Sequence, residues 1–287
     1  MSETIVISSN CQTGGIAATM RAIYPGKVIV PIRASAANDK KGSNALIAEL
    51  ANAAIWITGG RFELAQNLPV KVIKVPSINF HAFHPDLCYA EKKSANTLTK
   101  VHYNSQIAIW AFNNQIDTSD AVRLFNGSTF KALGYFDQWG ANAERLKLSF
   151  RQNDFSDIEF NQFFLAVKRR GVFMHSVNHP SAETIVEFCK LIAIRLGADQ
   201  GIVKRKIIIP DSLIGTIWPL YPEIGQELGL VGNYVWRIGN QEIEGLESYL
   251  DFAYQQYLEQ GIQPSDLVSK WPIPHLDSVL NTELKKR

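Results

Sequence analysis

The beginning of the chain alternates between short apolar runs and segments with helical spacing, and this pattern constrains the fold most strongly. Thr4 to Ser8 is a β-branched run that suits a buried strand, and apolar residues then recur at helical spacing from Ile16 to Ile23. Such alternation is typical of a parallel sheet with helices on its faces, so we predict an α/β fold. The same pattern predicts further strands at Lys27 to Ile32, Ala54 to Thr58 and Val70 to Val75, and a helix at Ser43 to Ala53.

The later parts of the chain are predicted to add helices to this sheet. From Ser105 to about Lys168 the pattern is helical, which predicts a helical insertion or lobe over one edge of the sheet. A strand at Gly171 to His175 and a helix at Ser181 to Leu196 then follow. We therefore expect one α/β domain spanning 1–287, with the insertion at about 105–168 and a C-terminal extension from about 231.

Composition and charge exclude several classes of protein. With 46% hydrophobic and 20% charged residues, the chain is typical of a packed globular protein rather than a disordered or coiled-coil one. A formal charge of +2 is too small for a protein that mainly wraps nucleic acid. No apolar stretch approaches the roughly 20 residues needed to span a membrane. Three widely spaced cysteines and the lack of an export signal favour a reducing cytoplasm.

The turn after the first predicted strand is the strongest candidate for a reactive site. Cys11 lies where the strand gives way to a helix, and ligands of open α/β sheets bind at the carboxyl ends of strands. The helix dipole is expected to lower the pKa of the thiol and make it a nucleophile. The amides of Asn10 or Gln12 could bind an oxyanion, and Gly14 and Gly15 would let a substrate approach the backbone. The alternative is a small buried cysteine in a tight turn.

A second polar segment also follows a predicted strand. It contains His175, Asn178 and His179, directly before a proline and a predicted helix. If its strand lies near the first one, His179 could reach Cys11 as the general base, with Asn178 orienting it. The alternative is a histidine that merely caps or turns the chain.

The stretch from Ser77 to His102 has little periodicity and is predicted to be a long loop, which is the kind of segment that often carries function. We interpret His81, His84 and Asp86 as substrate contacts first, as turn residues second and as metal ligands third, because no matching second cluster has metal-ligand spacing. No metal is therefore expected. Tyr103 and Ser105, just beyond the loop, are candidates for contacts to a sugar or adenine, with core packing as the alternative.

Basic clusters could hold the phosphates of a nucleotide-bearing ligand. They lie at Lys92 and Lys93, at Lys168 to Arg170 and at Lys204 to Lys206, the last at the start of a strand-like run that ends at Pro210. Most such clusters are solvated, and the sequence does not distinguish the two uses. No phosphate-binding glycine loop, GxSxG or HExxH motif is present in the sequence.

Several short motifs together resemble one known family. Ser9-Asn10-Cys11-Gln12 is similar to the opening motif of the WcbI family of capsular polysaccharide biosynthesis proteins. His84-Pro85-Asp86, Tyr103-Asn104-Ser105, Gly134-Tyr135-Phe136 and Asn178-His179-Pro180 follow in the order that the family shows. The similarity spans roughly Ile5 to Leu230 and is more specific as an ordered set than motif by motif.

The resemblance implies a coenzyme A-binding acetyltransferase that modifies a sugar of a capsular or surface polysaccharide, on a scaffold similar in outline to the SGNH esterases. Cys11 and Gln12 match the family's opening motif, and His179 matches its later one. Ser9 departs from the glycine more usual in the family, and the stretch from Val231 onward has no match in it.

Acyl transfer from a coenzyme A thioester to a sugar hydroxyl is the leading hypothesis, with Cys11, His179 and Gln12 as catalytic residues. Cys11 would act either as a transient acyl carrier or as a polar anchor beside the thioester, and His179 would take the proton of the acceptor. A first alternative is a deacylase that uses the same cysteine and histidine with water as acceptor. A second is a non-catalytic glycan- or nucleotide-binding component of an assembly complex, in which Cys11 is structural.

Overall fold

The computed structural model describes residues 3–33, 40–59, 70–94 and 97–286. The chain forms two compact units, which are described separately. Unit 1 comprises Met1–Phe80 and Ala143–Ile214, and unit 2 comprises His81–Asn142 and Gly215–Arg287. The chain thus passes between the units three times. The division of 1–287 into one domain with an insertion at 105–168 and an extension from 231 stays a prediction.

The core of unit 1 is a parallel sheet in the order β2-β1-β3-β4. In β1 every residue from Ile5 to Ser9 is buried, as expected for a strand with neighbours on both edges and helices on its faces. The structure confirms the predicted α/β fold with a parallel sheet. The strands are β1 (Thr4–Ser9), β2 (Val28–Arg33), β3 (Ile55–Thr58) and β4 (Lys71–Lys74).

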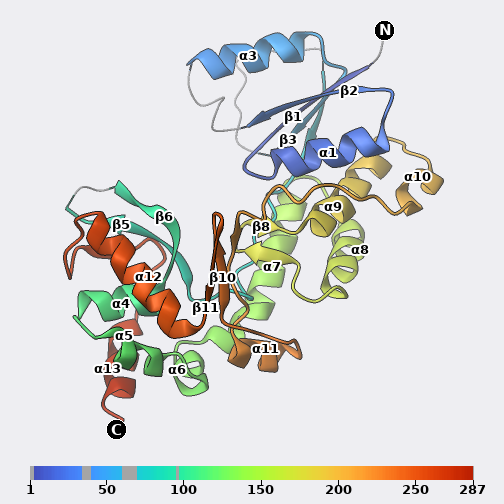
Figure 1. Cartoon of the computed structure of the whole chain (residues 1–287). Helices are drawn as coiled ribbons and strands as arrows, with labels where there is room; N and C mark the ends of the chain where they lie inside the picture. The colour runs from blue at the N-terminus through green and yellow to red at the C-terminus, as the bar shows by residue number, and fades with distance from the viewer. Residues whose placement is uncertain (1–2, 34–39, 60–69, 95–96, 287) are drawn as a thin grey trace. The chain divides into compact units, whose positions relative to one another are not determined.

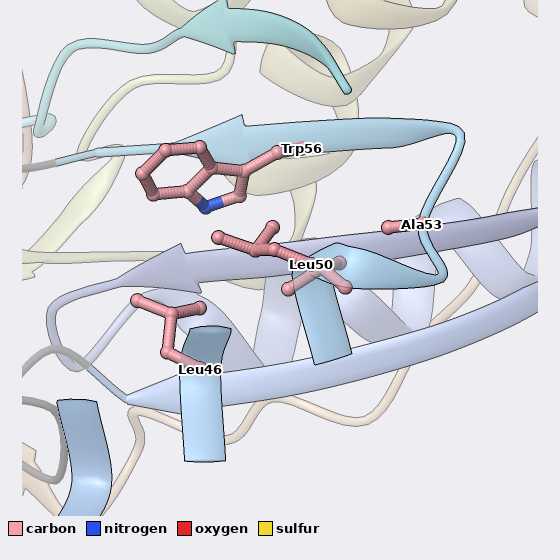
Figure 2. Close-up of a cluster of buried hydrophobic side chains, with 5 residues drawn as sticks. Leu46, Leu50, Ala53 and Trp56 are labelled. Atoms are coloured by element: carbon pink, nitrogen blue, oxygen red, sulfur yellow. The ribbon is translucent and has the colours of Figure 1, made fainter. Parts of the chain in front are cut away.

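Helices cover both faces of this sheet (Figure 1). On one face lies α3 (Lys40–Ala51), whose Leu46 and Leu50 pack with Ala53 against Trp56 of β3 (Figure 2). Val6 of β1 belongs to the same buried cluster. Each fully buried leucine or valine of this kind contributes about 1.5–3 kcal/mol relative to an exposed one. The cluster therefore fixes α3 on the sheet.

The opposite face carries α1 (Thr13–Ile23), which packs against α9 (Ala182–Arg195). Ser181 caps α9 by accepting a hydrogen bond from the backbone N–H of Thr184. Ahead of α9 lies a short antiparallel pair, β7 (Met174–Ser176) and β8 (His179–Pro180). Unit 1 is completed by the later part of α7 (Gln138–Gln152), by α8 (Asp157–Lys168) and by α10 (Gln200–Lys204).

Unit 2 combines two small sheets with several helices. The sheets have the strand orders β12-β5-β6 and β11-β10-β9. The strands are β5 (Leu87–Lys92), β6 (Thr97–Ser105), β9 (Thr216–Ile217), β10 (Val235–Ile238), β11 (Gln241–Glu244) and β12 (Leu267–Ser269). The helices are α4 (Gln106–Asn113), α5 (Thr118–Ala121), η1 (Val122–Leu124), α6 (Gly127–Ala132), η2 (Tyr135–Asp137), α11 (Pro222–Leu228), α12 (Leu246–Glu259) and α13 (Leu276–Leu284).

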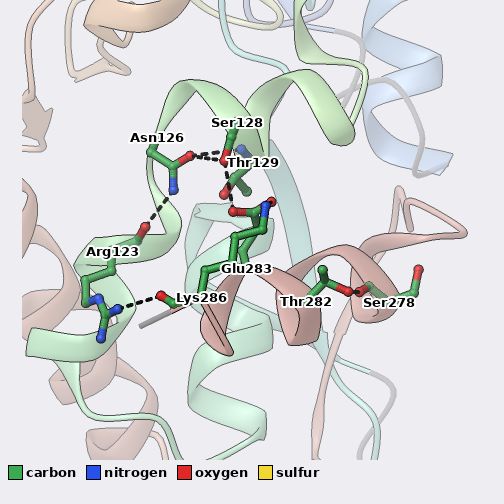
Figure 3. A network of polar contacts seen from close by, with 8 residues as sticks. All are labelled: Arg123, Asn126, Ser128, Thr129, Ser278, Thr282, Glu283 and Lys286. Atoms are coloured by element: carbon green, nitrogen blue, oxygen red, sulfur yellow. Dashed lines mark hydrogen bonds and ion pairs between the residues drawn. The ribbon is translucent and has the colours of Figure 1, made fainter.

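Polar contacts hold the last helix of unit 2 in place (Figure 3). Asn126 caps α6 by accepting from the N–H of Thr129, and its neighbour Ser128 donates to Glu283 of α13 at 2.9 Å. Arg123 donates to the carbonyl oxygen of Lys286 at 3.0 Å. Glu283 thus binds α13 to α6, and the bond to Lys286, just after α13, joins the end of the chain to η1.

Two predictions of local structure are wrong. The expected loop from Ser77 to His102 contains the antiparallel pair β5 and β6 instead, in which Tyr89 stacks on Tyr103 with ring centroids 5.4 Å apart. The charged run from Glu91 to Lys93, at the end of β5, interrupts the alternation of apolar and polar residues that marks a strand. The run from Lys204 to Pro210 is not a strand, because α10 ends at Lys204 and the following residues have no regular structure.

Among the described residues, no helix is long and apolar enough to cross a membrane.

Candidate functional site

The turn between β1 and α1 lies at the carboxyl end of the parallel sheet of unit 1. In the sheet, β1 has β2 on one side and β3 on the other, so the strand order reverses at β1. Ligands of open α/β folds bind at the carboxyl ends of strands at such a point. Gly59, directly after β3, donates its N–H to the carbonyl of Ser8 at 2.7 Å. A Cβ at Gly59 would lie 2.6 Å from the Ser9 hydroxyl, so the two strand ends approach as closely as a glycine allows.

Asn10 and Thr13 fix the shape of this turn. The Asn10 side-chain oxygen accepts from the N–H of Gln12 at 3.0 Å, and its amide nitrogen donates to the Ser77 hydroxyl at 3.2 Å. The Thr13 hydroxyl donates to the Asn10 carbonyl at 2.7 Å and accepts from the N–H of Ser9 at 3.1 Å. These bonds replace those that the first turn of α1 lacks, and they hold Cys11 in one position.

Cys11 is half-buried at the head of α1, and its thiol donates to the carbonyl oxygen of Asn178 at 3.8 Å. Burial raises the pKa of this thiol, and it outweighs the nearby backbone N–H groups and Arg33, which favour the thiolate. The prediction of a lowered pKa is therefore wrong. Cys11 is a thiol at neutral pH and needs a base to become a nucleophile.

Gln12 is buried and connects the turn to two other segments. Its Nε2 donates to the carbonyl oxygens of Ile78 at 2.8 Å and Asn178 at 3.2 Å, and its Oε1 accepts from the N–H of Ile78 at 3.2 Å. Both Nε2 hydrogens are thus engaged, so binding an oxyanion would require one of these bonds to break. In this geometry Gln12 positions the residues around Cys11; a catalytic role for it stays a prediction.

The segment of β7 and β8 that contains the histidines contacts Cys11 through Asn178. A role for His179 as the general base of Cys11 stays a prediction. Asn178, whose carbonyl oxygen contacts both Cys11 and Gln12, directly precedes His179. Burial lowers the pKa of His179, nearby His175 lowers it further, and Asp211 acts in the opposite direction. His179 is therefore a neutral imidazole at neutral pH, which is the form that accepts a proton.

The structure adds a residue that the sequence did not reveal. The carboxylate of Asp211 lies 2.6 Å from Nε2 of His175, and it also accepts from the N–H groups of Ala182 at 3.0 Å and Leu213 at 3.1 Å. Burial favours the neutral acid, but these three bonds outweigh it, so the pKa of Asp211 lies below its ordinary value. Asp211 follows the irregular run after α10, and no spacing in the sequence links it to His175.

The two glycines at the head of α1 have different surroundings. Gly14 is exposed, and a Cβ there would lie 3.7 Å from the Ser212 hydroxyl. Gly15 is buried, and a Cβ there would lie 2.6 Å from Cδ1 of Ile185 in α9. Gly15 therefore allows α1 and α9 to pack closely, whereas Gly14 leaves the backbone accessible.

The predicted site residues of the 81–105 region lie in unit 2. Asp86 is fully buried; it accepts from the hydroxyls of Tyr135 at 3.0 Å and Tyr221 at 2.9 Å and from the N–H of Ile107 at 3.1 Å. Burial raises its pKa despite these bonds. His84 is also buried, with Nδ1 3.3 Å from the carbonyl oxygen of Pro219. Both side chains are thus part of the core of unit 2.

The remaining three predicted contacts of this region also have structural partners in unit 2. His81 donates its backbone N–H to Asn142 at 3.0 Å, and Ser105 caps α4 through the N–H of Ala108 at 3.0 Å. Tyr103 is buried in its stack with Tyr89. A substrate contact by any of these residues stays a prediction.

Unit 1 holds a cavity of about 280 Å³ next to the Asp211 pair. Ala182, whose N–H binds Asp211, lines it, and so do the cationic side chains of Arg170, Lys190 and Lys206. Glu187 accepts from both Arg170 and Lys190. Within the described ranges, no group of three histidine, cysteine or acidic residues could hold a metal ion.

Comparison with known proteins identifies the family. The family described as polysaccharide biosynthesis enzyme WcbI matches residues 4–201. A solved structure of WcbI, described as a novel polysaccharide biosynthesis enzyme in a native form without a disulfide bond between coenzyme A and one of its cysteines, has the same fold. The TM-score is 0.71 at 13% identity, and the match covers 100% of this chain and 96% of that one. No curated protein sequence matches. The chain belongs to the WcbI family of polysaccharide biosynthesis enzymes.

Proposed function

We propose that this protein transfers an acyl group, expected to be acetyl, from a coenzyme A thioester to a sugar hydroxyl. The observation that carries the proposal is the placement of the Cys11 thiol against the segment that contains the neutral His179. Family membership supports a role in polysaccharide biosynthesis, and a structure of the same fold is described together with coenzyme A.

The chemistry divides into two exchanges. In the first, His179 takes the proton of Cys11, the sulfur attacks the thioester carbonyl, and coenzyme A leaves as a thiol with that proton. In the second, His179 takes the proton of the sugar hydroxyl, the new ester bond forms, and the bond from the acyl carbon to Cys11 breaks. The proton then returns to Cys11. Thioester exchange is nearly balanced in energy, so the acyl group stays reactive toward an alcohol.

The cavity beside α9 is the proposed place for the phosphates of the donor. Arg170 and Lys206 belong to two of the three basic clusters in the sequence, and both line this cavity. Charge-assisted hydrogen bonds from such side chains to phosphate oxygens are strong and favour an anionic ligand. The cavity is smaller than whole coenzyme A requires, so it would hold only part of the donor.

Two measurements test the proposal. Coenzyme A at 100 times its dissociation constant should stabilise the protein by about 2.7 kcal/mol, visible as a rise in Tm. With acetyl-coenzyme A labelled in the acetyl group and a panel of free hexoses and nucleotide sugars, the label should appear in a sugar ester, and Cys11→Ala should abolish this while keeping the Tm of the unliganded protein. Label in acetate alone would indicate a deacylase, and no thermal shift at millimolar coenzyme A would contradict the proposal.

A further inference from the structure

His175 and Asp211 form a close titratable pair in the segment whose Asn178 contacts Cys11, and the steps above do not use this pair. Both oxygens of the Asp211 carboxylate are held by the protein: one accepts from His175 and Ala182, the other from Leu213. The side chains are 18% and 21% exposed, so the pair is shielded without being sealed from solvent. Two backbone N–H groups therefore hold the Asp211 carboxylate in place, in addition to its contact with His175.

The geometry determines the tautomer of His175. An ionised carboxylate only accepts hydrogen bonds, so the ring nitrogen 2.6 Å away must carry a hydrogen. Neutral His175 therefore has its proton on Nε2, which leaves Nδ1 as the acceptor. A tautomer fixed in this way is how buried acids orient catalytic histidines in other enzymes.

The pair also acts on His179. Ser176 pairs with His179 across β7 and β8, which places the two histidines on adjacent strands. A positive charge on His175 disfavours protonation of His179, whereas the charge of Asp211 favours it. Among the residues that the structure describes, Cys11 contacts the preceding Asn178, and Arg33 acts electrostatically on Cys11. Asp211 is thus the anion that can balance a proton taken up by either histidine.

We propose that Asp211 is a positioning residue of this site: it fixes the tautomer of His175 and stabilises the charge that the two histidines acquire when His179 accepts a proton. The source of that proton, Cys11 or the sugar hydroxyl, rests on the proposed function. The tautomer of His175 does not depend on it. In Asp211→Leu no acceptor faces Nε2, so the tautomer of His175 is no longer fixed; Asp211→Asn removes the charge but keeps an amide oxygen that can accept from Nε2 and Ala182.

The first test is the titration of the full chain labelled with ¹⁵N-histidine, with His175→Gln and His179→Gln used to assign the signals. The wild type should show His175 with hydrogen on Nε2. In Asp211→Leu hydrogen on Nε2 should no longer predominate, and in Asp211→Asn the pKa of His179 should fall because its counter-charge is lost. An unchanged tautomer in Asp211→Leu, or an unchanged pKa of His179 in Asp211→Asn, would overturn the proposal, whatever happens to activity.

The second test is the rate of acetylation of Cys11 by acetyl-coenzyme A as a function of pH. Asp211→Asn should lower this rate about 10²-fold, a size typical of lost acid–base assistance, and should move the acid limb of the profile to lower pH. Asp211→Glu, which keeps the charge, should recover part of the rate. A lower rate with an unmoved profile would mean a merely structural role. Failure of the wild type to be acetylated, with the predicted histidine signals present, would refute the proposed function alone.

Discussion

Asp86 and Asp211 are both acids shielded from solvent, yet they occupy opposite kinds of environment. Asp86 in unit 2 is fully buried and is held by two tyrosine hydroxyls and a backbone N–H. Asp211 in unit 1 is 21% exposed and is bound to His175. The pKa of the first is raised by burial, and that of the second is lowered by its hydrogen bonds. The same residue type thus belongs to the core in one unit and to the proposed site in the other.

The largest effect should come from removing the buried acid. Asp86→Ala leaves the hydroxyls of Tyr135 and Tyr221 and the N–H of Ile107 without their acceptor, and we expect a loss of about 3 kcal/mol or more in the free energy of unfolding. Asp211→Ala, as the matched variant, should cost less because water can reach its partners. Equal losses, measured by denaturant unfolding, would contradict the comparison. A loss of coenzyme A binding at unchanged stability in Asp86→Ala would support the substrate contact expected from the sequence.

The two acids should also affect stability with opposite dependence on pH. Because the folded-state pKa of Asp86 is raised, its contribution is present below the unfolded pKa of 3.8 and is lost as pH rises through the folded value. The lowered pKa of Asp211 gives a contribution that is present above 3.8 and is lost as pH falls through the folded value. Differences in unfolding free energy between wild type and Asp86→Asn or Asp211→Asn, measured across pH, should therefore slope in opposite directions. Slopes of the same sign would remove this distinction.

The smallest effect concerns the cavity of unit 1. Lys206→Ala should raise the Kd for coenzyme A by about 5-fold, which corresponds to roughly 1 kcal/mol, because one exposed charge on a phosphate contributes little. Lys204→Ala is the matched control, since Lys204 is exposed and belongs to the same basic cluster but does not line the cavity. Isothermal titration calorimetry distinguishes the two variants. Equal effects of both would indicate general electrostatic attraction rather than a phosphate contact.

Local sequence patterns predicted the parallel strands and the first helix of unit 1. The β-branched run from Thr4 to Ser8 and the helical spacing from Ile16 to Ile23 identified β1 and α1, and thereby placed Cys11 at the end of the sheet. The helices between Ser105 and Lys168 were also anticipated. These features depend on neighbours in the sequence, which is why the sequence reveals them.

Features that depend on distant contacts were missed. The contact of Asp211 with His175 joins two segments that share no sequence motif. Pairing between β5 and β6 stabilises both strands, but the interrupted alternation of their residues does not predict it. The thiolate prediction for Cys11 counted the helix dipole but could not weigh burial, which depends on the three-dimensional structure and prevails. The sequence can therefore indicate a candidate reactive residue, but the protonation state of that residue depends on the three-dimensional structure.

The most direct test of the central claim is mass spectrometry of the intact protein and its peptides after brief exposure to acetyl-coenzyme A without an acceptor. The account predicts one acetyl group, carried by Cys11, while Cys88 and Cys189, which are fully buried, stay unmodified. Modification should be absent in Cys11→Ala. Native protein that binds coenzyme A yet never carries an acetyl group on Cys11 would contradict the covalent mechanism.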